Sequence, residues 1–249
     1  GVAESLALLG SRANALASTS HGHAEGTVRI VVGKLLHQAD WVTWASLNNE
    51  MPLLAEAAPD EFLDALEAAL ADPSSSPFIE VFRQEGSGGI GGWNYITGIL
   101  WALETLAWHP DHLGRATLLL GDLAAIDPGG TWANRPLNSL TDIFLPWISH
   151  TLADLPTRKN ALESLLRDHP DIAWKLLLTL LPSFHGSTSG THKPIWRSFI
   201  PPGWKETVTV PQYWQQVQVY AEICTRLAAL DLDKLVELVD RLADLPEPA

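Results

Sequence analysis

Hydrophobic residues recur at intervals of three and four along most of the chain, the spacing of an α-helix that buries one face. Ile96, Ile99, Leu100 and Leu103 form one such stripe. Strict alternation of apolar and polar residues, the pattern of a half-buried strand, is almost absent. The β-branched run at 27–32 favours a strand by composition, but no second strand lies nearby in the sequence to pair with it. The pattern therefore predicts an all-α fold.

Three short motifs, each a proline followed by an aspartate, separate successive stripes. Their prolines are Pro59, Pro110 and Pro170, which lie 51 and 60 residues apart. Proline suits the first turn of a helix because its missing N–H has no partner there, and an acidic residue beside it favours the positive end of the helix dipole. Each junction predicts a helix, a tight turn and a second helix. Because such hairpins bury their faces by stacking, we expect a short α-solenoid of stacked antiparallel hairpins, loosely HEAT-like, with an irregular helical bundle as the alternative.

The composition is that of a globular chain with a sizeable core, with 249 residues of which 46% are hydrophobic and 18% charged. We expect residues 1–249 to form a single helical-repeat domain. The chain begins with Gly1 rather than Met, so we expect it to be part of a longer protein. The segments 73–92 and 182–211 interrupt the helical pattern and are predicted to be irregular insertions.

The charge balance and the single cysteine narrow the class of protein. With 16 Lys and Arg against 29 Asp and Glu, the formal net charge is −13, which disfavours nucleic acid as a partner. No apolar run reaches the roughly 18 residues that a transmembrane helix needs, so no contact with a membrane is expected. Cys224 is the only cysteine. It excludes an intramolecular disulfide and fits a reducing compartment, so we expect a cytoplasmic protein.

No recognisable catalytic or metal-binding motif stands in the sequence. The nine histidines form no His-Glu-x-x-His arrangement, no Gly-x-Ser-x-Gly elbow is present, and the glycine-rich stretch at 86–92 lacks the Gly-Lys-Ser/Thr ending of a P-loop. We therefore predict a protein that is not an enzyme and that uses no metal or cofactor. The alternative is a small metal-dependent hydrolase on a helical bundle, using His185 and His192 with an acidic residue.

Two irregular segments carry the candidate partner-binding residues, since binding groups concentrate on loops that a rigid scaffold holds. Tryptophan and arginine are the residue types most often found as anchors of protein interfaces. The candidates are Trp132, Asn134 and Arg135 in the first segment, and His192, Trp196, Arg197 and Trp204 in the second. The alternative for both segments is internal packing, in which the Trp rings fill gaps between hairpins and Arg135 pairs with a carboxylate or a helix C-terminus.

Four stretches resemble the helical-repeat region of large bacterial proteins. One of them reads Ile-Asp-Pro-Gly-Gly-Thr-Trp-Ala-Asn-Arg-Pro, and the four stretches are residues 44–63, 98–108, 126–136 and 192–197. In proteins of that kind an effector and a signalling ATPase of the STAND type precede the repeats, and several related systems act in defence against phage. The resemblance covers about residues 40–210. It implies a sensor or scaffold that recognises a protein partner, such as a phage protein, while nucleotide hydrolysis takes place elsewhere. A structural scaffold for homo-oligomerisation is the other hypothesis.

Overall fold

The computed structural model describes residues 1–12, 22–86, 93–183 and 187–243. These residues form α-helices joined by turns and loops, with one 3-10 turn and an isolated bridge between Ile148 and Thr207 in place of any β-sheet. The all-α prediction is confirmed, and the β-branched run at 27–32 lies inside a helix. The helices are α1 (Val2–Ser11), α2 (His23–Leu36), α3 (Trp41–Ser46), α4 (Met51–Ala57), α5 (Pro59–Leu70), α6 (Pro77–Arg83), α7 (Thr97–Ala107), α8 (Pro110–Ile126), α9 (Pro136–Phe144), α10 (Leu155–Asp168), α11 (Pro170–Leu180), α12 (Val210–Ala228) and α13 (Leu232–Ala243).

Prolines begin the second helix of three hairpins, as the sequence predicts. Pro59, Pro110 and Pro170 are the first residues of α5, α8 and α11. One or two residues separate each proline from the end of the preceding helix, and the two helices of each pair pack against each other. The proline-aspartate motif therefore locates three of the turns correctly.

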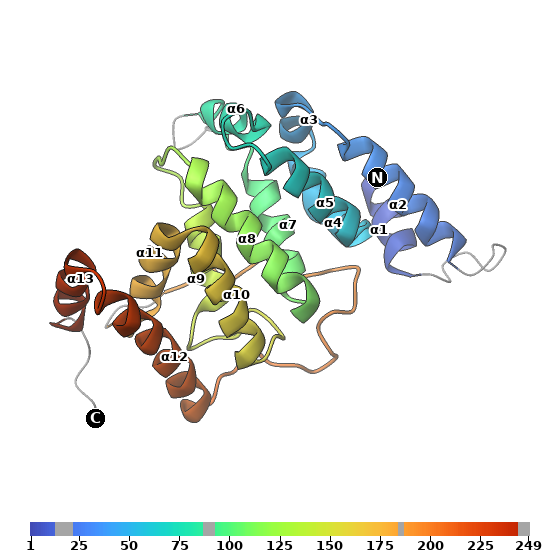
Figure 1. Ribbon diagram of the computed structural model, residues 1–249. Coiled ribbons are helices and arrows are strands. Elements are labelled where there is room, and N and C mark those ends of the chain that lie inside the picture. The colour runs from blue at the N-terminus through green and yellow to red at the C-terminus, as the bar shows by residue number, and fades with distance from the viewer. Residues whose placement is uncertain (13–21, 87–92, 184–186, 244–249) are drawn as a thin grey trace.

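The longer helices lie in two rows that pack against each other (Figure 1). In one row α4 lies between α1 and α7, and in the other α2, α5, α8 and α10 each contact the next. Helix α9 packs against α7, α8 and α11, and α12 and α13 follow α11 at the far end. The short helices α3 and α6 interrupt the repetition. The described residues thus fit an irregular helical bundle, the alternative architecture that the sequence predicts.

A continuous apolar core joins α2 through to α13. Its largest buried side chains include Trp44, Trp108 and Phe62. Cys224 is fully buried on α12, and this burial raises the pKa of its thiol to about 12. The thiol therefore stays protonated and unreactive at neutral pH, as its place on an apolar stripe predicts.

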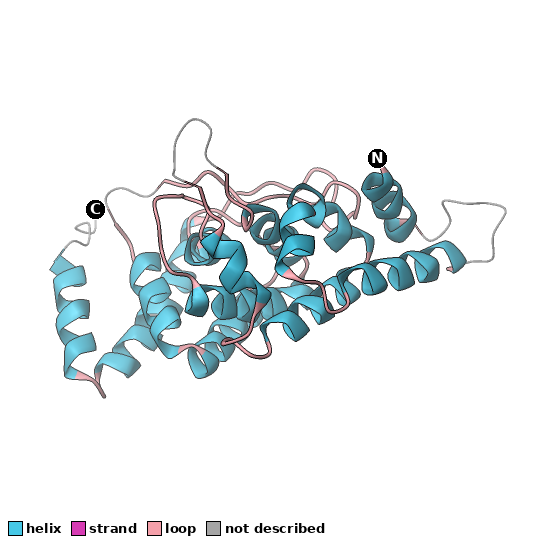
Figure 2. Ribbon diagram, turned by 90° about the horizontal axis from the view of Figure 1, so that it is seen from above, coloured by secondary structure: helices cyan, strands magenta, loops and turns pink. Residues whose placement is uncertain are grey.

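The irregular segments lie mostly on one face of the helix rows (Figure 2). Segment 73–92 is not wholly irregular, because Pro77–Arg83 forms α6, whose phenylalanines Phe78 and Phe82 are buried in the core. A helix of two turns is too short to show a clear period in the sequence, which is why this part of the prediction was wrong. The glycine-rich residues 87–92 lie outside the described residues. None of the described helices has the length and apolar character needed to cross a bilayer.

Candidate partner-binding surface

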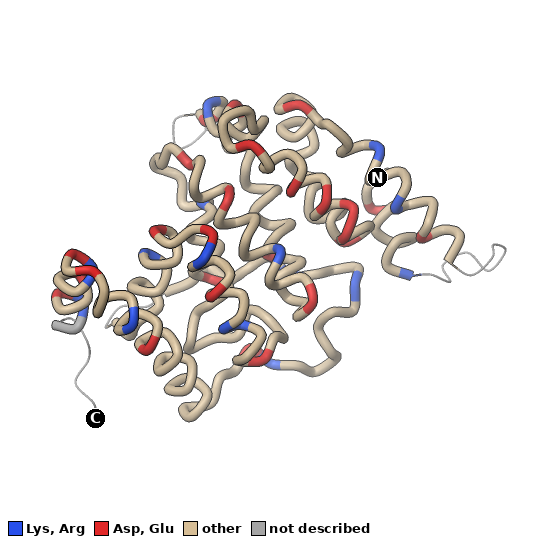
Figure 3. Tube along the Cα trace, in the orientation of Figure 1, with Lys and Arg blue, Asp and Glu red and all other residues tan. Residues whose placement is uncertain are grey.

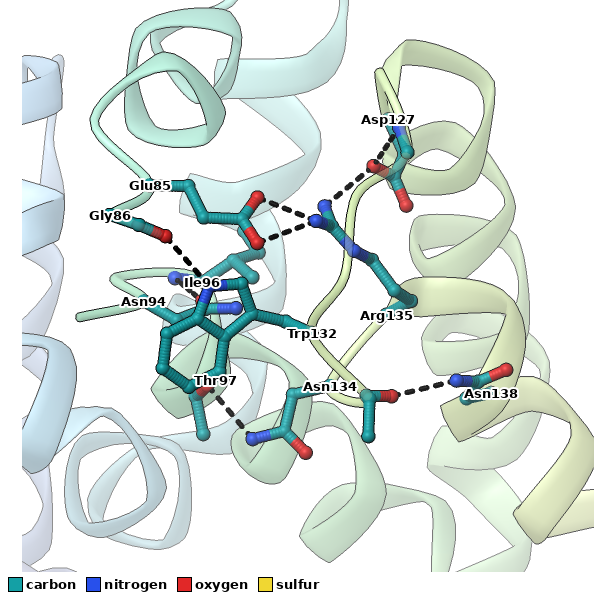
Figure 4. A network of polar contacts seen from close by, with 12 residues as sticks. Glu85, Gly86, Asn94, Ile96, Thr97, Asp127, Trp132, Asn134, Arg135 and Asn138 are labelled. Carbon is teal, nitrogen blue, oxygen red and sulfur yellow. Dashed lines mark hydrogen bonds and ion pairs between the residues drawn. The ribbon is translucent and has the colours of Figure 1, made fainter. Parts of the chain in front are cut away.

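Arg135 joins the ends of two helices to the start of a third (Figure 4). Its Nη2 donates to both carboxylate oxygens of Glu85 at 2.6 Å, and its Nη1 donates to Asp127 Oδ1 at 2.9 Å. Glu85 follows α6, Asp127 follows α8, and Arg135 precedes α9, so one guanidinium pairs with two carboxylates from separate elements. Arg135 is only 7% exposed. The structure therefore gives Arg135 the internal role that the sequence leaves open as the alternative.

Gly130 makes room for this guanidinium. A Cβ atom at Gly130 would lie 2.0 Å from Arg135 Nη2, and the residue has a φ of +154°. Only glycine satisfies both the close approach and this backbone conformation.

Trp132 and Asn134 bind to the same region but keep part of their surface exposed. The indole Nε1 of Trp132 donates to the carbonyl oxygen of Gly86 at 3.0 Å, and Asn134 Nδ2 donates to Thr97 Oγ1 at 3.0 Å. Both side chains are half-buried. Trp132 therefore fixes the loop to the segment after α6 and Asn134 fixes it to the start of α7, and each side chain keeps part of its surface exposed.

The second segment crosses the helix rows as a strap, the name used here for residues 187–209. Its centre is bound by Glu56 of α4, a carboxylate that is only 1% exposed. The backbone N–H groups of Ile195, Trp196 and Arg197 donate to Glu56 at 3.0, 2.7 and 2.8 Å. Three amides thus satisfy a buried negative charge, which would otherwise be costly to bury.

Arg197 caps the ends of two helices. Its Nε donates to the carbonyl oxygen of Glu56 at 2.5 Å, and its Nη2 donates to the carbonyl oxygens of Gly10 and Ala57 at 2.9 and 3.2 Å. These carbonyls belong to the last turns of α1 and α4, where they lack partners within the helix. Arg197 is half-buried and, like Arg135, binds groups of the same chain.

His192 joins the strap to α7 through a second buried carboxylate. Glu104 accepts a hydrogen bond from the His192 backbone N–H at 2.8 Å and another from Ser139 Oγ at 2.6 Å. Burial raises the pKa of Glu104 above its ordinary value, while these two hydrogen bonds oppose the rise. The His192 ring lies 3.0 Å from Thr105 Oγ1 through Nδ1. The strap is therefore attached to two neighbouring helices of one row, α4 and α7, through Glu56 and Glu104.

Trp196 and Trp204, the remaining candidates, are half-buried in the strap. Trp204 packs edge to face against the buried Trp108, with ring centroids 5.5 Å apart. Trp196 provides one of the amides that bind Glu56. Both residues contribute to the attachment of the strap.

Trp101 stands out because it is the one residue of α7 that is not buried. Its side chain is 41% exposed, and its ring stacks on His192 with centroids 5.3 Å apart and planes 20° apart. Thr97, one turn earlier on the same face of α7, holds Asn134. The contacts of the strap and of the first loop thus meet around Trp101.

Partly exposed aromatic and apolar side chains lie beside these contacts. Trp93 is 54% exposed and donates from Nε1 to the carbonyl oxygen of Gln84, beside the Gly86 carbonyl that Trp132 binds. Ile195 is exposed as well, three residues after His192. We call these side chains the aromatic strip, which consists of Trp93, Trp132, Trp101, His192 and Ile195.

The candidate residues thus divide into two groups. Trp132, Asn134 and His192 lie in or beside the aromatic strip, whereas Arg135, Trp196, Arg197 and Trp204 hold its loops in place. In the described part of the chain, no group of three or more His, Cys, Asp or Glu residues is arranged to hold a metal ion. His185, which the hydrolase alternative requires, lies outside the described residues.

The comparisons with known proteins add no relative. No family model, no curated protein and no solved structure matches this chain.

Three important residues were not singled out from the sequence: Glu56, Glu104 and Trp101. The two glutamates carry a readable signal, because each is a charged residue within an apolar helical stretch, Leu-Leu-Ala-Glu-Ala-Ala and Ala-Leu-Glu-Thr-Leu. A buried carboxylate needs donors, so such a position indicates a partner from elsewhere in the chain. Trp101 has no such signal, since one more large apolar residue on an apolar helix reads as core.

Proposed function

We propose that this chain is a non-catalytic protein-recognition module that binds its partner through the aromatic strip. The observation that carries the proposal is the exposure of Trp101 on a helix whose other residues are all buried. Exposed clusters of large apolar side chains mark interaction sites, and tryptophan is enriched among the residues that dominate binding energy.

The way the strip is held supports this function. Arg135 fixes the loop that carries Trp132, and Glu56 and Glu104 fix the strap that carries His192 and Ile195. Side chains that are ordered before binding lose less conformational entropy on association. A strip attached in this way is suited to specific contact with a folded partner.

The electrostatics of the strip favour an apolar partner surface. Burial lowers the pKa of His192 below its ordinary value, so its ring is neutral at pH 7. Charged residues gather elsewhere, for example on α5 (Figure 3), where Asp60, Asp64 and Glu67 surround Arg115 of α8. The expected partner therefore offers a complementary apolar or aromatic patch rather than a highly charged surface.

We extend the proposal to the parent protein. The two rows of helices are consistent with a short α-solenoid, and the stretches at 44–63, 98–108, 126–136 and 192–197 resemble repeats of STAND-type defence proteins. The chain would then be the cytoplasmic sensor of a larger bacterial antiphage protein, and the partner a phage protein.

The proposal is tested by affinity capture from phage-infected and uninfected bacterial lysates, followed by titration of the purified captured protein. Three baits are compared: the unaltered chain, Trp101→Ala, and Trp214→Ala as the matched control. Trp214 is a 52% exposed tryptophan on α12, outside the aromatic strip. We expect one phage protein to bind the chain and the control but to bind Trp101→Ala at least about tenfold more weakly, the effect of losing an anchoring tryptophan. Equal binding to all three baits, or no binding to any, contradicts the proposal.

Self-association through α13 is a second candidate function, favoured by a different observation. Leu232, Leu235, Val236 and Val239 form an exposed apolar stripe on one face of this helix. The opposite face packs on the body, where Trp174 Nε1 donates to Glu237 at 2.6 Å. A mass that rises with concentration in light scattering, and that returns to the monomer value in Val236→Glu, would support this function. A constant monomer mass in the unaltered chain would exclude it.

A further inference from the structure

Arg158 on α10 is a buried cation for which the described residues provide no carboxylate partner. The residue is 3% exposed. Its Nη2 makes two long contacts, 3.3 Å to the carbonyl oxygen of Leu145 and 3.5 Å to the hydroxyl of Tyr220, and its Nε donates to no acceptor within the described residues. Because a guanidinium keeps its proton in proteins, this arrangement buries a full positive charge without a counter-charge. Such an arrangement is unfavourable unless an anion completes it.

A polar pocket opens beside this guanidinium. Its volume is about 380 Å³, and it lies between the first turns of α10 and α12 and the neighbouring loop and strap. The lining includes Ser149, Thr151, Arg158, Trp204, Lys205 and Gln216. Gln216 is 7% exposed, and its Oε1 accepts no hydrogen bond from the described part of the chain. Two residues that line the pocket, Arg158 and Gln216, thus each have a buried polar atom without a hydrogen-bond partner in the described part of the chain.

The electrostatics of the pocket favour an anion, although the chain as a whole is acidic. Lys205 adds a second cation at the exposed edge. Helices α10 and α12 both begin at the pocket, so the positive ends of two helix dipoles lie there. The carboxylate of Asp154, which also lines the pocket, caps α10 by accepting from the Thr157 N–H at 2.9 Å. Within the described residues it forms no ion pair with Arg158.

We propose that this pocket binds a small organic anion, a carboxylate or a phosphate ester. Its anionic oxygens pair with the guanidinium of Arg158 and with Lys205, and a hydroxyl or amide of the same molecule pairs with the side-chain amide of Gln216. The volume suits a small metabolite, and the Trp204 ring forms an apolar wall for its carbon skeleton. This site is separate from the aromatic strip, and the proposal does not depend on the function proposed above.

The test measures thermal unfolding and calorimetric binding of the chain with L-malate and with inorganic phosphate. Sodium chloride at matched ionic strength is the reference. We expect malate or phosphate to raise the Tm above the chloride reference, and which of them does so identifies a carboxylate or a phosphate site. Arg158→Met should abolish this shift, and Lys205→Ala should weaken binding about threefold, the effect of one exposed charge.

The Tm of Arg158→Met without ligand shows whether a lost anion response comes from misfolding of the variant. Replacing an unpaired buried charge with an apolar side chain of similar length is expected to raise the Tm of Arg158→Met above that of the unaltered chain in chloride. Three results would overturn the proposal: no shift beyond chloride with either anion, the same shift in Arg158→Met, or a lower Tm for Arg158→Met without ligand, which would make Arg158 a structural residue.

Discussion

The loop before α9 and the strap are both held by carboxylates, partly buried ones for the loop and a fully buried one for the strap, but they use different donors. The loop provides a side chain, Arg135, whose guanidinium binds Glu85 and Asp127. The strap provides backbone N–H groups, which bind Glu56. In the loop the attachment therefore depends on the identity of one loop residue. In the strap the contact with Glu56 depends on the helix residue, so the side chains of Ile195 and Trp196 are not needed for it, although the Arg197 side chain caps α1 and α4.

This difference explains why two segments of similar composition have different surfaces. The loop has its arginine buried and shows one half-buried tryptophan. The strap is bound to Glu56 through its backbone amides. Ile195 therefore has its amide bound while its side chain extends into solvent.

The largest expected effect comes from removing the carboxylate that holds the strap. Glu56→Leu leaves three partly buried amides without their acceptor. At about 1–3 kcal/mol each, the free energy of unfolding should fall by roughly 4 kcal/mol in urea denaturation. Glu222→Leu is the control, since this exposed carboxylate bonds only to Gln218, and it should change stability by at most about 0.5 kcal/mol. Equal losses in the two variants would contradict the role of Glu56.

Arg135→Met should give the next largest effect, because it leaves two carboxylates without their cation. We expect a loss of about 3 kcal/mol in the free energy of unfolding, the low end for breaking a buried ion pair. Adding Glu85→Gln to this variant should restore part of the loss, because the second change removes one of the two uncompensated charges. If the two changes are additive, Arg135 and Glu85 are not coupled as the structure indicates.

A pH titration sharpens the comparison at Glu104, the second carboxylate that binds the strap. Burial raises the pKa of Glu104 in the folded protein above its ordinary value of 4.5. The folded state then holds the proton more tightly than the unfolded chain, so the contribution of Glu104 to stability falls as pH rises from about 4.5 through the folded-state pKa. Across this window, the difference in unfolding free energy between the unaltered chain and Glu104→Gln should change with pH, by at most about 1.4 kcal/mol per pH unit. Parallel pH profiles would show that the carboxylate is not perturbed.

The smallest expected effect concerns a strap side chain. Ile195→Ala removes an exposed side chain and keeps the amide that binds Glu56, so the free energy of unfolding should change by less than about 0.5 kcal/mol. A loss comparable to that of Glu56→Leu would mean that the strap is held by its side chains after all.

The sequence predicts the helices far better than it predicts the course of the strap. Apolar stripes and proline-aspartate junctions are local signals, and they locate α5, α8 and α11 at their first residues. The contact between Glu56 and Ile195 joins positions 139 residues apart. Its donor is a backbone amide, which every residue except proline provides, so nothing in the strap sequence identifies it.

The candidate site was predicted in part for the same reason. Trp132, Asn134 and His192 are conspicuous polar or aromatic residues in irregular segments, and the structure brings them to one strip. Arg135 and Arg197 looked equally conspicuous, but the sequence does not reveal the carboxylates and helix carbonyls that occupy them. The strap covers one side of Trp101 through His192 and leaves the rest of the ring exposed. The sequence of α7 alone does not show this.

Amide hydrogen exchange of the strap tests the central claim most directly, because the attachment of the strap is what positions the aromatic strip. We predict that the amides of Ile195, Trp196 and Arg197 exchange at least about a hundredfold more slowly than free amides in the unaltered chain, and that Glu56→Gln removes most of this protection. Exchange of these three amides at the rate of an unstructured loop in the unaltered chain would contradict the account.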